Sequence, residues 1–107
     1  MTNDSLDKME QIIDNAQHIS DEKKTELHQL AHELRDELLE LEKTEKQHAQ
    51  SIAGFSQQAT HESLREDQDE ELLNISVKGM KSSVRKFEVT HPELTRVIQQ
   101  ICAAFGV

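Results

Sequence analysis

The chain has 107 residues, of which 35% are hydrophobic, 31% charged and only 3% aromatic, so it is long enough for one modest domain but too polar for a thick interior. Twelve basic against twenty-one acidic residues give a formal net charge of −9, which repels phosphate backbones and anionic lipid heads. These values favour one thin-cored helical domain over residues 1–107 and argue against nucleic-acid and membrane partners.

The sequence also bears on the compartment and on thiol chemistry. It has no run of roughly 20 apolar residues, and its first residues lack a basic segment followed by an apolar one, so we expect a cytoplasmic protein. The single cysteine, Cys102, cannot form an internal disulfide. Its apolar neighbours Ile98, Ile101 and Phe105 predict a buried small hydrophobic side chain rather than a redox group.

In chain order, the first predicted helix covers residues 4–18, with Leu6, Met9 and Ile13 on one stripe. Ser20 then precedes Asp21 and Glu22, a pattern typical of a helix start. Because no proline or glycine precedes Gly54, we predict one helix over residues 21–64, on the order of 65 Å long. Gly54 and its polar neighbours are the weak point of that helix.

The next segments are shorter. Residues 65–71 are polar and acidic and predict the turn, and a third helix is expected at 71–89 with its own apolar stripe. Pro92 interrupts that stripe, and Thr90 and Glu93 have capping-box spacing, so a fourth helix is expected at 92–105.

These segments predict an all-α fold, a long antiparallel helical hairpin or coiled-coil-like bundle with a short N-terminal helix and a proline-marked break before the last helix. One hairpin would leave the leucine row of the long helix half covered, so we expect homodimerisation through the apolar seams, in a parallel or an antiparallel arrangement. The residues expected to form the packing and oligomer seam are Leu27, Leu30, Leu34, Leu38, Leu41, Ile52, Phe55, Val77, Met80, Val84 and Phe87.

Two histidine patterns are candidates for metal binding. His28 and His32 lie four residues apart with Asp36 four further on, which permits a divalent-ion site, although the sequence HQLAH lacks the glutamate of a zinc protease. Glu45 and His48 form the E-x-x-H spacing used by di-iron bundles. We interpret both patterns as solvated or register-setting polar residues and predict no metal and no cofactor.

No serine or cysteine lies in a nucleophile motif and no glycine-rich loop is present, so we predict a protein without catalytic residues. The charges are unevenly distributed, with an acidic segment at residues 62–71 and a basic strip formed by Lys78, Lys81, Arg85 and Lys86. This strip either stays solvated or docks an acidic partner and orients the dimer.

The closing segment FEVTHPELTRVIQQICAAFGV carries a recognisable run, formed by Phe87, Glu88, His91, Pro92 and Leu94. With its F-E-x-x-H-P-x-L motif, the chain resembles a small bacterial family of uncharacterised all-helical proteins, a domain of unknown function. The resemblance extends to residues 19–41. It implies a helical fold and brings no activity, cofactor or partner. For His91 we expect a capping or packing role at the helix start rather than ligand binding.

The leading functional hypothesis is a non-enzymatic, self-associating interaction or scaffold protein. Two alternatives stay open: a metal-binding, di-iron-like helical bundle that uses Glu45 and His48, and an adaptor or antitoxin-like protein whose apolar seam is covered by an unidentified protein partner.

Overall fold

The computed structural model describes residues 2–106. Within that range the chain forms α-helices and one 3-10 turn, and no strand, so the predicted all-α class is confirmed. The helices are α1 (Thr2–Asn15), α2 (Asp21–Glu42), α3 (Lys46–Leu64), α4 (Glu70–Val84), η1 (Arg85–Phe87) and α5 (Pro92–Ala104).

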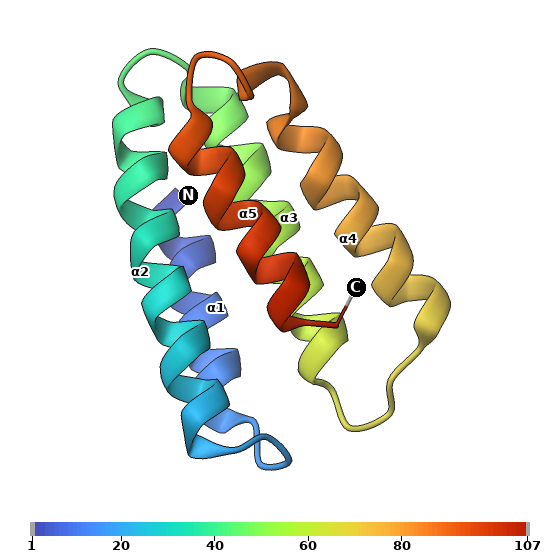
Figure 1. Cartoon of the computed structure of the whole chain (residues 1–107). Coiled ribbons are helices and arrows are strands. Elements are labelled where there is room, and N and C mark those ends of the chain that lie inside the picture. Colours follow the sequence, from blue (N-terminus) through green and yellow to red (C-terminus); the bar gives the residue numbers. More distant parts are fainter. Residues whose placement is uncertain (1, 107) are drawn as a thin grey trace.

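Consecutive helices run in opposite directions, as the ribbon in Figure 1 shows. Helices α2, α3, α4 and α5 form a four-helix arrangement in which α2 contacts α3 and α5, and α4 contacts the same two helices. Helix α1 packs against α2 and α3. The bundle measures 38 × 25 × 22 Å, so its longest dimension is well below the length of the expected rod.

The prediction of one helix over residues 21–64 is wrong, because the chain turns at residues 43–45 and reverses into α3. The amides of Thr44 and Glu45 both bond to the Leu41 carbonyl, which tightens the last turn of α2. No glycine or proline marks this turn. The fold-back lets the leucine row of α2 pack against α3, and this burial outweighs the helix propensity of the connecting residues.

The suspected weak point at Gly54 lies inside α3, which continues unbroken to Leu64. Two polar side chains in this helix are fully buried, and each bonds to the backbone one turn earlier. The Ser56 hydroxyl donates to the Ile52 carbonyl and the Thr60 hydroxyl to the Ser56 carbonyl, both at 2.7 Å. Burial of these side chains is therefore compatible with an intact helix.

The other predicted boundaries need smaller corrections. Helix α1 ends at Asn15 rather than at 18, and α4 ends at Val84, after which η1 and a turn replace the expected helix up to residue 89. The expected helix at 92–105 corresponds to α5. Ser20 caps α2 as predicted, by accepting the Lys23 amide.

The predicted seam forms the core of a single chain. All of its residues except Phe55 are buried, and Leu34 and Leu38 are fully enclosed. The expectation that the leucine row would stay half covered is wrong, because α1, α3 and α5 all pack against α2. Self-association, if it occurs, therefore needs a surface other than this row.

Candidate functional site

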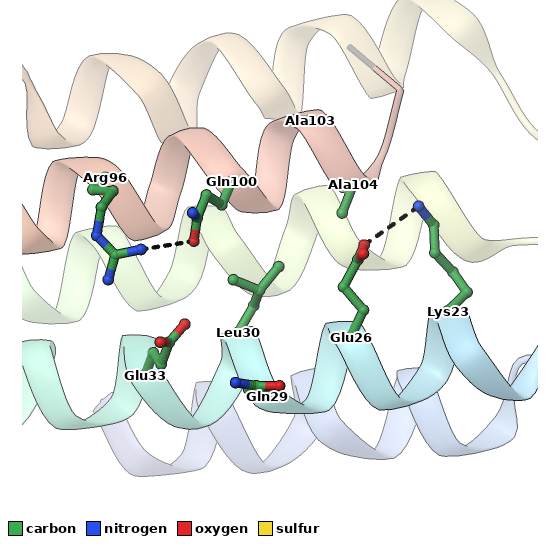
Figure 2. A pocket seen from close by; sticks show the side chains of 9 residues that line it. All are labelled: Lys23, Glu26, Gln29, Leu30, Glu33, Arg96, Gln100, Ala103 and Ala104. Carbon is green, nitrogen blue, oxygen red and sulfur yellow. Dashed lines mark hydrogen bonds and ion pairs between the residues drawn. The ribbon is translucent and has the colours of Figure 1, made fainter.

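An open groove of about 600 Å³ lies between α2 and α5 (Figure 2). Three of its four charged side chains pair along their own helices, and Glu33 is the exception within the described part of the chain. The Lys23 ammonium lies 3.6 Å from the Glu26 carboxylate, and the Arg96 guanidinium donates to Glu93 and Gln100 at 2.9 Å. Among the predicted seam residues, only Leu30 lines this groove.

The groove is lined by glutamine, alanine, leucine and charged side chains, and its lining contains no cysteine, serine or histidine. The charges also lie near solvent, where their fields are screened. We therefore interpret the groove as a solvated surface channel between two packed helices.

The predicted His28–His32 site forms part of a polar contact between α1 and α2. His28 lies 2.6 Å from the Asp14 carboxylate and His32 lies 3.2 Å from the Glu10 carboxylate. Arg35 donates to the same Glu10 carboxylate at 2.9 Å. The two histidines thus lie side by side on α2, and each contacts a carboxylate of α1. These contacts join α1 to α2.

Glu45 and His48 do not form an inward-facing ligand pair. Glu45 is the N-cap residue of α3 and has non-helical backbone angles, so it lies just outside the regular helix that carries His48. The His48 ring stands edge-to-face with Phe87 at 5.4 Å, and its Nε2 lies 3.3 Å from the Lys86 ammonium. The polar break in the leucine row is explained by the turn rather than by a register-setting layer.

The closing motif builds the corner between α4 and α5. Phe87 is buried there, and its ring contacts His91 edge-to-face at 5.6 Å. His91 makes no capping bond through its side chain and lies 3.0 Å from the Thr90 hydroxyl, so the expected Thr90 capping box is absent. Pro92 opens α5 and Leu94 is fully buried. The motif therefore has a packing role in this structure.

The most unusual surface lies on α3 and α4. Phe55, Leu72 and Ile75 are 43%, 42% and 60% exposed, although all three are large and apolar. The Phe55 ring lies directly over Gly79, where an added Cβ would come within 2.6 Å of it. We call Phe55, Leu72, Ile75 and Gly79 the apolar face. Grouped exposed apolar residues on a folded protein are typical of a binding surface.

A comparison with protein-family models matches residues 33–106 to a domain of unknown function, DUF4404. The chain belongs to the DUF4404 family. Searches among curated proteins and among solved structures find no match. The resemblance drawn from the closing motif agrees with this membership.

The DUF4404 match covers the second part of α2 and all of α3, α4 and α5. It therefore includes both the corner built by the closing motif and the apolar face. Helix α1, with its polar contact to α2, lies outside the matched residues.

Sequence reasoning identified Phe55 as a seam residue but missed the rest of the apolar face of this DUF4404 member. Leu72 and Ile75 lie off the stripe that runs from Leu73 to Phe87, and this departure was the available signal. The close approach of the Phe55 ring to Gly79 joins two helices, so spacing within one helix does not predict it. Glu10 and Arg35 were missed for the same reason.

Three further observations concern thiol chemistry, metal binding and membrane crossing. Cys102 is buried on α5, and burial raises the pKa of its thiol. Among residues 2–106, no group of three or more histidine, cysteine, aspartate and glutamate side chains is arranged to hold a metal ion. In the same part of the chain, none of the helices combines the length and the apolar character that crossing a membrane requires.

Proposed function

We propose that this protein is a non-enzymatic helical module that acts by binding polypeptide chains, first of all a second copy of itself. The observation that carries the proposal is the apolar face on α3 and α4, which leaves three large apolar side chains exposed on one side of an otherwise well-buried core. The leucine seam does not support this proposal, because its leucines are buried within one chain.

The remaining surface supports a binding role better than a catalytic one. The α2–α5 groove is open, and three of its four charged side chains are paired within their own helices. A metal-binding bundle is less well supported, because His48 lies against Phe87 and Lys86 and, among residues 2–106, it belongs to no group of three or more potential ligands. The net charge of −9 disfavours nucleic acid as the partner.

We place this binding in the cytoplasm. The one thiol of the chain, Cys102, is buried and uncombined, which is compatible with a reducing compartment. A domain of this composition needs no disulfide, because its helices already enclose a continuous core.

The test is the solution mass across a dilution series, measured by sedimentation equilibrium. We expect the chain to reach twice its 12.3 kDa monomer mass as the concentration rises. Ile75→Asp should hold it at the monomer mass, because a carboxylate would then have to be buried in the interface.

Val89→Asp is the matched control, since Val89 is 91% exposed in the corner before α5 and lies outside the apolar face. It should associate like the unmodified chain. A monomer at every concentration, or equal association of the Ile75→Asp variant, would show that the apolar face does not join two copies.

A further inference from the structure

The outward side of α4 has two parallel features. Along one line lie Leu72, Ile75 and Gly79, which belong to the apolar face. Beside them, on the flank away from α3, Glu71 and Lys78 recur seven residues apart, a spacing that returns to the same side of a helix. Both charged side chains are exposed, and within residues 2–106 neither takes part in an ion pair.

The order of charge along α4 is the second feature. The helix begins with Glu70 and Glu71, and its second half carries Lys78 and Lys81, followed by Arg85. Two such helices attract each other when they run in opposite directions, because the acidic start of one then faces the basic end of the other. A parallel pair places like charges side by side along its whole length.

The geometry points to an antiparallel, two-fold symmetric pairing of α4 with α4 of a second copy, about an axis through Ile75. This inference rests on the proposed self-association and assigns it a surface and a register. A two-fold axis perpendicular to the helices brings the same flank of both copies together, so the flank that carries Glu71 and Lys78 meets itself in reverse order.

The register follows from positions along the helix. Glu71 lies four residues before Ile75 and Lys78 three residues after it, so Glu71 of one copy lies within about 1.5 Å, along the axis, of the level of Lys78 in the other. The pairing forms twice by symmetry. Ile75 then meets its own copy at the axis.

The same register gives the apolar side chains a place. Leu72 lies three residues before Ile75 and Gly79 four after it, so Leu72 of one copy reaches the level of Gly79 in the other. Because the Phe55 ring of the same chain covers Gly79, Leu72 of the other copy meets the exposed part of that ring at this level. A leucine that packs against the ring is shielded from water, and this burial favours association, while the charges set its direction.

Charge reversal tests the pairing. Glu71→Lys and Lys78→Glu should each weaken dimerisation about 10-fold or more, because each single change turns both symmetric pairs into repulsion. The double variant, with both changes in one chain, should restore the dissociation constant to within a few-fold of the original. Asp36→Lys on α2 and Lys46→Glu at the start of α3 are matched controls away from α4, and they should change it little.

Cysteine cross-linking gives a second readout of direction, in a Cys102→Ala background. Glu71→Cys mixed with Lys78→Cys should form a disulfide between the two chains, whereas each variant alone should form little. Each variant cross-linking readily to itself would show a parallel pair and overturn the inference. Circular dichroism and melting of every variant check that the fold is intact.

The outcomes separate the two proposals. If the chain dimerises but the charge reversals have no more effect than the controls, another surface joins the copies, so the inference fails and self-association stands. If the chain stays monomeric under all conditions, both fail, and a different protein remains the candidate occupant of the apolar face.

Discussion

The α1–α2 contact and the outer side of α4 differ in whether their charged side chains are paired. Where α1 covers α2, carboxylates of α1 meet basic side chains of α2, as in the contact of Glu10 with Arg35 and His32, beside the fully enclosed Leu34 and Leu38. On the outer side of α4, Glu71 and Lys78 form no ion pair with any residue that the structure describes, and the large apolar side chains of Leu72 and Ile75 lie exposed beside them. The α1–α2 interface thus combines paired charges with buried apolar side chains. The outer side of α4 carries the same two kinds of side chain, but there they remain exposed.

The largest loss of stability is expected from a substitution in the leucine row of α2. Leu34→Ala should lower the free energy of unfolding by about 2–5 kcal/mol, because it leaves a cavity in a fully enclosed site. Leu39→Ala is the matched control on the same helix, since Leu39 is 37% exposed, and it should cost less than about 1 kcal/mol. Denaturant unfolding measures both. Equal losses would mean that the leucine row is not enclosed within one chain.

A second variant loosens the polar contact that holds α1. Arg35→Ala removes hydrogen bonds to Asn3, Asp7 and Glu10 at once and should cost roughly 1–2 kcal/mol. Lys43→Ala, which breaks an exposed pair with Glu40, should cost close to nothing.

Denaturant unfolding again supplies the numbers for this pair of variants, and a double-mutant cycle of Arg35→Ala with Glu10→Gln isolates their coupling. If Arg35 and Glu10 show no coupling, the paired charges between α1 and α2 contribute no more to the free energy of unfolding than solvated charges do. The α1–α2 contact and the outer side of α4 would then not differ in this respect.

The contact between Phe55 and Gly79 offers a finer test of the apolar face. Alanine at Gly79 improves helix propensity by about 1 kcal/mol, but its Cβ would meet the Phe55 ring at 2.6 Å. Gly79→Ala should therefore gain nothing in the unmodified chain and about 1 kcal/mol in a Phe55→Ala background. The same gain in both backgrounds would show that the ring does not lie on the glycine.

The smallest expected effect concerns Cys102. Burial raises the pKa of its thiol above the unfolded value, so the folded chain retains this proton at a pH where the unfolded chain has lost it. The stabilising contribution is complete at neutral pH and declines as the pH rises above about 8.5. Unmodified protein should thus lose slightly more stability than Cys102→Ala between pH 7 and about pH 9.5.

Alkylation of native Cys102 should also be much slower than alkylation of the unfolded chain, since the thiolate is the reactive form. Equal alkylation rates would place this thiol on the surface, in conflict with its burial on α5.

Local patterns predicted a large part of the fold. The apolar stripes of α1, α4 and α5 and the cap at Ser20 follow from spacing within one helix. The turn at residues 43–45 could not be predicted in the same way. Leu41 and Ile52 are eleven residues apart, close to three helical turns, so the stripe stays in phase across a connection that contains neither glycine nor proline.

The candidate surface was harder to predict than the core. Whether a leucine row is covered by its own chain or by another depends on how helices distant in sequence are arranged. Here α1, α3 and α5 pack against α2 and bury Leu34 and Leu38, so these two leucines have no role in assembly. Ile75 presents the reverse case. It lies on a helix with a complete apolar stripe of its own, so its exposure became apparent only when the neighbours of α4 were known.

The most direct test follows backbone amide resonances of isotope-labelled protein across a dilution series. Concentration-dependent shifts should concentrate at Ile75, Lys78 and Gly79 on α4 and at Phe55 on α3, while Leu6 and Arg35 in the α1–α2 contact stay fixed. Shifts centred on α1 and α2, or no shifts in α4 while the mass doubles, would contradict the claim that the α1–α2 contact is complete within one chain and that α4 binds the second copy.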